Sequence, residues 1–573
     1  MKLKTTLRTN KGYALIVMMM LAAVSLLILG GALRWTSSTA SNTDRNNIYF
    51  DTLAAAEAAT EKVVARISRD FQTHGEGVVY ASLPVYRTLL PTSAEDEYWN
   101  NFNFNNGGGT ENRTHVERLT AWGYTNLNSQ YAGLKAMAST YRIVSNARTE
   151  GSSRPMTAAL KQEIQIASIP VFQFAIFYTM DLEINPGPDM TINGRVHSNG
   201  EIYTRPNSSV TYLDHVTAVR NINLFQSPMD PSTRPTDGVV KFKSEHDARV
   251  SSLTLPIGTN NSPAAVHSVV EIPSWSESPS SPMGKQRYFN KADVVMLYSD
   301  SGIAALARNH LGVLTPIPAA QFNTFASTNS SHSFYNKREG KTVKTIELCV
   351  ECFKIFSEGY FRGHYGNSAR NANTIYIADT RTLPSNSQSG IRVVNGETLP
   401  SGGLTIATRN PIYVKGDFNS PASTRGTSNT AGTKPSSIVA DSITILSDDW
   451  NDSEGHKSLS YRKARNTTVN AAFLGGIVAS DGVYYSGGVE NFPRFLENWS
   501  GRTFTYNGSM VVMFYSQISN APWPGTGDVY NPPNRNWAFD VNFMDATKLP
   551  PGTPQLLTTI RGKWEILPPN TIL

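Results

Sequence analysis

Cysteine is nearly absent from this chain: only Cys349 and Cys352 occur among its 573 residues. Two cysteines exclude a scaffold held by many disulfides, and they exclude a zinc site built from cysteines alone. Charged residues make up 17% of the sequence and hydrophobic residues 40%, a balance that excludes an intrinsically disordered chain. The 42 glycines and 32 prolines are ordinary frequencies, which excludes a collagen-like or low-complexity protein.

Common catalytic motifs are missing as well. The sequence contains no HExxH, no GxSxG and no phosphate-binding loop of the Walker type, so it does not indicate the enzyme classes that depend on them. His197, in the stretch GRVHSNG (194–200), ends an alternating segment. We expect it to be a corner residue that bonds to backbone rather than a ligand or catalyst, and we expect no catalytic residues.

The net charge of +6 at first favours an anionic partner. Four of the cations, however, come before a long apolar segment: Lys2, Lys4, Arg8 and Lys11. The chain that follows them carries about +2 and has no long basic run. The excess of positive charge therefore indicates membrane topology, and we expect no nucleic-acid partner.

Residues 13–33 contain no charged residue. A helix of 21 residues spans about 31 Å, the thickness of the hydrocarbon core of a bilayer. Five of its residues are expected to anchor the chain: Leu15, Val17, Leu21, Leu27 and Leu33. The cations before it place the N-terminus in the cytoplasm and the rest of the chain outside. A cleaved secretion signal, a plain signal anchor and a processed but retained helix all remain open.

The junction Lys11-Gly12-Tyr13 resembles the processing site of a type IV prepilin of class III. A short basic leader (residues 1–12) ends in Gly, and the apolar segment follows at once. In that family a peptidase cuts after the Gly on the cytoplasmic side and the hydrophobic helix is retained. Major pilins carry Glu at the fifth mature position, where this chain has Val17, so the resemblance implies an atypical, assembly-type member.

A stalk helix is expected within residues 34–75. Between residues 46 and 72, apolar side chains recur at spacings of three and four, at Ala56, Ala59, Val63, Ile67 and Phe71. The string FDTLAAAEAATEKVVARI (50–67) resembles the segment after the membrane helix in PilX-type pilus-assembly proteins. The stripe fits packing on the helix's own domain and packing with partner helices equally well.

The rest of the chain is predicted to be mainly β. In the region 76–185, residues 140–148 and 156–169 alternate and predict two antiparallel strands. Residues 186–220 and 401–573 hold short strands with Gly and Asn corners, typical of a β-solenoid, here a right-handed parallel β-helix. We expect 221–400 to be an insertion with loops and the C-terminal segment to cap the solenoid. A β-sandwich is the alternative.

Parts of this body also resemble the exported region of prepilin-like proteins of Gram-negative bacteria, among them DLEINPGPDMTINGRVHSNGEIY (181–203) and IVADSITILSDDWND (438–452). The resemblance implies a non-catalytic inner-membrane protein, a minor pilin-like component or assembly factor of a type IV pilus or type II secretion system. Its partners would be other pilin or pseudopilin subunits, with a surface or carbohydrate ligand for the periplasmic or extracellular body. The alternative is a membrane-anchored carbohydrate-binding protein or a β-helix polysaccharide lyase or hydrolase.

Two small clusters remain as candidate sites. Cys349 and Cys352 form a CxxC, for which a disulfide is the default in an oxidising compartment; free thiols and a redox or metal role are the alternatives. Asp448, Asp449 and Asp452 are candidate calcium ligands, because calcium prefers carboxylate oxygens on flexible loops. Their spacing lacks the EF-hand glycine, so a solvated loop is the alternative, and we expect no other cofactor.

Overall fold

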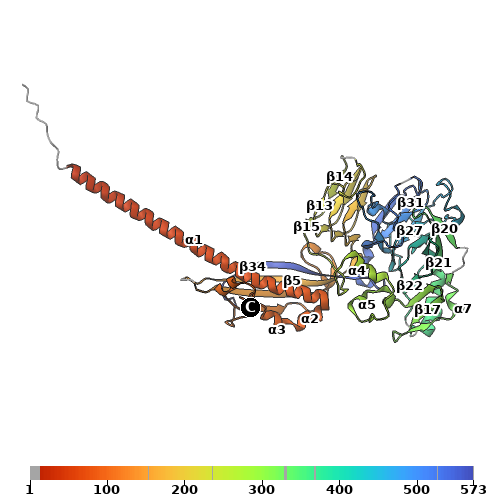
Figure 1. Ribbon diagram of the computed structural model, residues 1–573, viewed down its shortest axis with the longest axis horizontal. Helices are drawn as coiled ribbons and strands as arrows, with labels where there is room; N and C mark the ends of the chain where they lie inside the picture. Colours follow the sequence, from red (N-terminus) through yellow and green to blue (C-terminus); the bar gives the residue numbers. More distant parts are fainter. Residues whose placement is uncertain are drawn as a thin grey trace, which may run out of the picture.

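The computed structural model describes residues 13–151, 154–234, 237–327, 332–366, 370–525 and 527–571. The chain forms a long N-terminal helix, an antiparallel sheet beside the far end of that helix, and a large β body of several sheets (Figure 1). The expected order of one helical region followed by mainly β structure is therefore confirmed.

The helix α1 runs without a break from Tyr13 to His74, about 93 Å at 1.5 Å per residue. The membrane and stalk segments, expected separately over 13–33 and 34–75, are one element. No proline interrupts this stretch. The helix ends before Gly75, whose φ of 82° lies in the left-handed region that glycine adopts at low cost.

An antiparallel sheet lies against the C-terminal part of α1. Its main order is β1 (Phe102–Asn105), β4 (Lys135–Thr149), β5 (Thr157–Pro170) and β34 (Gln555–Leu567). Two short strands, β2 (His115–Arg118) and β3 (Gly123–Asn126), also pair with β4. The pairing of β4 with β5 confirms the two antiparallel strands expected over 140–148 and 156–169. Because β34 pairs with β5, the C-terminal strand returns to the start of the fold.

The packed part of α1, from Thr52 to Phe71, buries one face of the helix: Thr52, Ala55, Ala56, Ala59, Thr60, Val63, Val64, Ile67, Asp70 and Phe71. The alanines belong to a cluster with Leu160 of β5, and their small side chains let the helix approach the sheet. The expected stripe thus packs on its own domain. Two short helices, α2 (Glu76–Ala81) and α3 (Leu83–Arg87), follow.

Beyond β5 the chain enters three ladders of short parallel strands. The first holds β6 (Ile176–Tyr178), β9 (Val196–Ser198), β12 (Val216–Ala218) and β15 (His246–Ala248). The second holds β7 (Leu182–Ile184), β10 (Ile202–Thr204) and β13 (Ile222–Asn223), and the third β8 (Met190–Ile192), β11 (Ser209–Tyr212) and β14 (Val239–Phe242). Ile176 pairs with Val196 and Val196 with Val216, so the first turns are 20 residues apart. This parallel pairing differs from the antiparallel sheets of a β-sandwich.

The first ladder continues into a 12-stranded sheet whose spatial order is β15-β12-β9-β6-β32-β29-β26-β24-β22-β16-β17-β18. The added strands are β16 (Val294–Ser299), β17 (Gly302–Arg308), β18 (Leu314–Pro316), β22 (Thr374–Asp379), β24 (Leu404–Thr408), β26 (Ser436–Ala440), β29 (Ala472–Ile477) and β32 (Met510–Tyr515). The chain enters this sheet in the middle at β6 and runs out to β15. It then crosses to β16 and returns strand by strand until β32 pairs with β6. We call this β6–β32 pairing the seam.

A column of buried apolar side chains crosses the seam. Directly paired residues of successive strands belong to one hydrophobic cluster: Val294, Ile375, Ile406, Ile438, Phe473, Met510, Ile176, Val196 and Val216. Stacking of like positions is how repeated parallel strands bury a core. The core is therefore continuous, although the chain builds it in two separate stretches.

Residues 221–400, expected as an insertion, supply strands to these same sheets. Besides β13, β14, β15, β16 and β22, they contribute β19 (Ala326–Ser327), β20 (Ser333–Asn336), β21 (Lys341–Cys349) and β23 (Ser387–Val394) to a seven-stranded sheet with β25 (Ile412–Lys415), β27 (Ile443–Leu446) and β30 (Arg494–Phe495). The crossing from β15 to β16 carries α4 (Pro263–His267), α5 (Pro282–Gln286) and α6 (Tyr288–Lys291). A last sheet holds β28 (Thr467–Asn470), β31 (Thr503–Gly508) and β33 (Asn534–Phe539).

Candidate functional site

The bare half of α1, from Tyr13 to Ala40, is exposed along its whole length. The five expected anchor residues lie in it, with exposed fractions from 51% for Val17 to 76% for Leu27. Among the described residues, one helix is long and apolar enough to cross a membrane, and it is α1. Each large apolar side chain gains about 1.5–3 kcal/mol on leaving water. The bare half is therefore a candidate membrane anchor.

Of the expected processing site, Lys11 and Gly12 lie outside the described residues. Tyr13 is the first residue of α1, and the first turn of the helix contains no acidic side chain. The position of Val17, where major pilins carry Glu, is exposed on that helix.

A polar stretch of α1, residues 34–51, separates the apolar run from the packed part. It begins with Arg34 and the exposed Trp35. Tryptophan is enriched at the membrane–water interface. The hydroxyl of Thr36 donates to the carbonyl oxygen of Ala32 at 2.8 Å, so this polar side chain is satisfied within the helix. At 1.5 Å per residue, the 18 residues hold the antiparallel sheet about 27 Å beyond the apolar run.

Comparisons with known proteins add little to this geometry. No family model matches the sequence, and no curated protein matches it. Among solved structures, the chain can be superposed on the competence-associated pilin ComZ from Thermus thermophilus, at 10% identity over 91% of this chain and 98% of that chain, with a TM-score of 0.30. A TM-score at this level carries no argument about fold or function.

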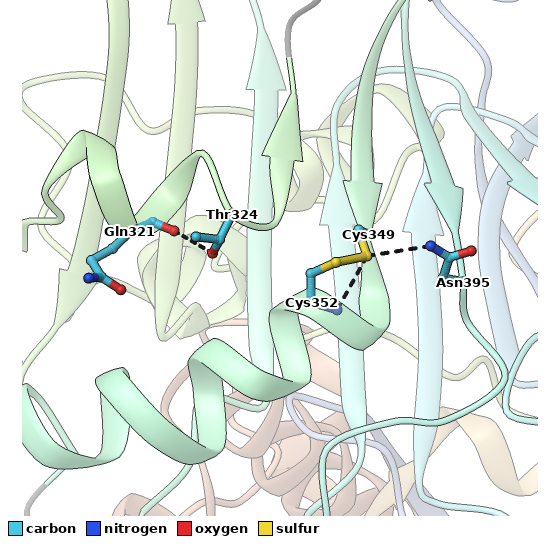
Figure 2. Close-up of a disulfide and its surroundings, with 5 residues drawn as sticks. All are labelled: Gln321, Thr324, Cys349, Cys352 and Asn395. Carbon is cyan, nitrogen blue, oxygen red and sulfur yellow. Dashed lines mark hydrogen bonds between the residues drawn. A yellow bond between two sulfur atoms is a disulfide. The ribbon is translucent and has the colours of Figure 1, made fainter.

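Cys349 and Cys352 are joined by a disulfide where β21 meets α8 (Val350–Phe356) (Figure 2). The backbone N–H of Cys352 donates to Cys349 Sγ at 3.3 Å, and the side-chain amide of Asn395, beyond β23, donates to the same sulfur at 3.6 Å. Since Cys349 also pairs with Val394 in the ladder, the disulfide closes a corner at the end of two paired strands. The disulfide thus links the end of β21 to the first turn of α8.

The three candidate calcium ligands are paired with arginines. Asp448 and Asp449 lie 3.1 and 3.7 Å from the same guanidinium nitrogen of Arg465. Asp452 accepts from Arg392 at 2.6 Å. Nowhere in the described part of the chain do three or more His, Cys, Asp or Glu side chains gather as a metal site. The geometry thus gives the calcium hypothesis no support.

Asp448 and Asp452 line a polar hollow of about 450 Å³ over β21, β23 and β25, together with His332, Glu347, Arg392, Val394, Asn395 and Lys415. A glycosidase requires two carboxylates that flank an open position for substrate. Here Glu347 and Asp452 both accept hydrogen bonds from one guanidinium, that of Arg392, at 2.9 and 2.6 Å. Each of these two carboxylates therefore accepts from the same arginine that lines the hollow.

His197 is fully buried in β9. Its ring nitrogens lie 2.8 Å from Thr217 Oγ1 and 3.0 Å from Asn199 Oδ1, so it bonds to side chains rather than to the expected backbone groups. The ring stacks on Phe177 with 5.4 Å between centroids. Burial lowers the pKa of His197 to about 4, which keeps the ring neutral at physiological pH. It is a core residue next to the seam.

We expect the buried Glu497 to make the folding stability of the body depend on pH. The side chain is buried, and its oxygens accept from the N–H and the hydroxyl of Ser447, each at 2.6 Å. Burial raises its pKa to about 7 from an ordinary value near 4.5. A raised carboxyl pKa favours the folded state at low pH, and this contribution is lost as the pH rises from about 4.5 through 7.

Glu497→Gln should therefore raise the melting temperature of the purified protein at pH 8, where the wild type carries a buried charge that costs about 3 kcal/mol. At pH 4 the two proteins should melt alike. Thermal unfolding followed by circular dichroism at both pH values measures the difference. An equal offset at pH 4 and pH 8 would show that Glu497 is not the titrating group.

A group of charged residues beside the seam, Arg338, Glu339 and Arg494, was not predicted from the sequence. Arg338 and Glu339, in the turn between β20 and β21, meet Arg494 of β30, whose Nη1 donates to Glu339 Oε1 at 3.1 Å. No motif marks these positions, because they are about 155 residues apart in the chain. The path of the strands alone brings them together.

Proposed function

We propose that this protein is a non-catalytic, membrane-anchored exported subunit of a type IV pilus or a type II secretion system, similar to a minor pilin or pseudopilin. The observation that carries the proposal is the division of α1 into a bare apolar half and a half packed on an antiparallel sheet. Such a helix can lie in the inner membrane before assembly and among other apolar helices afterwards. Its folded domains remain attached to it in both places.

The proposed topology follows from the charges at the N-terminus. The basic leader stays in the cytoplasm, and the β body lies in the periplasm or on the assembled fibre. The resemblance of residues 50–67 to PilX-type proteins supports an assembly factor or minor component. Other pilin or pseudopilin subunits would contact the bare half of α1.

For the body we propose a right-handed β-solenoid that serves as an interaction surface. The turns of 20 residues and the apolar column that crosses the seam support this description. The arginine pairing of Glu347 and Asp452 supports a role in binding rather than in polysaccharide cleavage. A large non-catalytic body of this kind suits a position at the tip or flank of a fibre.

Processing at Gly12 tests the proposal. In cells that contain a prepilin peptidase, N-terminal sequencing of the mature protein should give a chain that begins at Tyr13. Gly12→Val should retain Met1, because the cut in that family follows a Gly, whereas the matched leader variant Thr9→Val should be processed normally. A wild-type protein that begins at Met1, or near residue 33, contradicts the proposal.

A further inference from the structure

A small polar cavity of about 80 Å³ lies beside the seam. Its walls come from residues 178–183 in the first turn of the ladders, from residues 476–480 at the end of β29 and just beyond it, and from the turn that carries Arg338. Met229 and Tyr515 are exposed and mark its mouth. These three segments are neighbours because β32, near the end of the chain, pairs with β6 in the first turn. The cavity therefore depends on the seam.

Arg338 is the unusual group in this cavity. Its Nε is buried and has no hydrogen-bond partner among the residues that the structure describes. The neighbouring Arg494, in contrast, makes three hydrogen bonds to described residues. It donates to Glu339 Oε1 at 3.1 Å, to the carbonyl oxygen of Ser519 at 2.9 Å and to Ser516 Oγ at 3.1 Å. One wall of the cavity thus carries a second guanidinium with donor capacity to spare.

The charge of Arg338 is costly in this place. Burial, together with the positive charge of Arg494, lowers its pKa to about 9, yet the side chain stays protonated at neutral pH. The side chain is partly buried, and its buried Nε lacks a hydrogen-bond partner among the described residues, which destabilises the fold. A carboxylate in the cavity would offset this cost, because the planar fork of arginine matches the two oxygens of a carboxylate.

Other residues of the lining carry oxygen atoms that can accept hydrogen bonds from hydroxyl groups. Glu183 is buried and accepts hydrogen bonds from the hydroxyls of Ser480 and Ser486, each at 3.0 Å. Asp181, also in the lining, is exposed and accepts from the N–H of Glu201 at 2.9 Å. These oxygens would repel an anion but can accept further hydrogen bonds from neutral donors.

We propose that the cavity binds the carboxylate of a small acid, with an acidic sugar as the favoured source: its carboxylate lies against Arg338 and its hydroxyls face Glu183 and Asp181. The volume admits a carboxylate and the carbons next to it, so the rest of the molecule extends past Met229 and Tyr515. The site stands independently of the proposed role in assembly, because none of its residues belongs to α1.

Calorimetric titration of the full-length protein in detergent at pH 7 tests the site. Sodium glucuronate should bind, sodium acetate should bind roughly tenfold more weakly because it lacks hydroxyls, and glucose should give no signal. Arg338→Met should weaken glucuronate binding at least about tenfold. Its melting temperature without ligand should be no lower than that of the wild type, since a buried N–H donor without a partner has been removed.

Lys337→Met provides the matched control. Lys337 lies in the same turn, but it pairs at 2.9 Å with the exposed Asp528. The variant removes the same charge and should bind glucuronate as the wild type does. The proposal is overturned if the wild type shows no binding at roughly 10 mM glucuronate, if Arg338→Met binds normally, or if both variants lose binding alike. Equal affinity for acetate and glucuronate would keep the carboxylate site and reject the sugar.

Discussion

Replacing Leu21 and Leu27 together by arginine should abolish membrane insertion of this protein and leave the melting temperature of its folded domains unchanged. Both side chains lie in the bare half of α1, with exposed fractions of 58% and 76%. An arginine near the centre of a membrane helix costs about 2.5–3.5 kcal/mol, so the pair costs roughly 6 kcal/mol, or about four orders of magnitude in insertion. Because no part of the described chain covers these positions, the folded domains lose no contact.

The disulfide reports the compartment of the variant. A chain that fails to insert remains in the cytoplasm, where its cysteines stay reduced. We therefore expect Cys349 and Cys352 to react with a thiol-alkylating reagent in the arginine variant and to be protected in the wild type. Carbonate extraction of membranes gives the second measurement. The double alanine variant at the same positions should stay in the membrane with its cysteines oxidised; an arginine variant that does the same would contradict the anchoring role.

Ala59→Arg should strongly destabilise the antiparallel sheet domain. Ala59 is completely buried between α1 and the sheet, in the cluster with Leu160. An arginine there overfills the interface and buries a charge without a partner, which costs about 3–5 kcal/mol. Hydrogen exchange of peptides from β4 and β5 should accelerate roughly 10²–10³-fold.

Ala54→Arg is the matched control for that variant. Ala54 lies on the same helix but on its exposed side, where a substitution changes stability by about 0.5 kcal/mol or less. Exchange in β4 and β5 should stay at the wild-type rate. If Ala54→Arg accelerated exchange as much as Ala59→Arg, the described orientation of α1 on the sheet would be wrong.

Local signals made the helical segments of α1 and the strand pair β4–β5 predictable. The uncharged run at 13–33 and the stripe from Ala56 to Phe71 each depend only on the period of a helix. Likewise β4 and β5 are neighbours in the chain and alternate, so their antiparallel pairing follows from a short connection. The sequence did not show that membrane and stalk segments form one helix, because the polar residues 34–51 between them lack an apolar period.

Long-range pairings could not be predicted. Ile176 pairs with Met510 across the seam and Ala159 with Leu567 in the first sheet. Each pair joins residues that lie hundreds of positions apart. No short turn connects the two strands of either pair, so no local signal indicates which strands become partners. For the same reason residues 221–400 read as an insertion, although their strands extend the same sheets as those before and after them.

The basic leader, the apolar run and the alternating segments are properties of the sequence alone. They predicted a long N-terminal helix, a candidate membrane anchor, followed by a mainly β body, and the structure contains such a helix and body. They suffice because membrane insertion and local secondary structure depend on residues close together in the chain. Only the tertiary structure decided that the two cysteines close a corner between paired strands, that the acidic residues near 450 are held by arginines, and that Arg338 faces a cavity. Those features arise where distant turns stack, and burial there depends on which strands become neighbours.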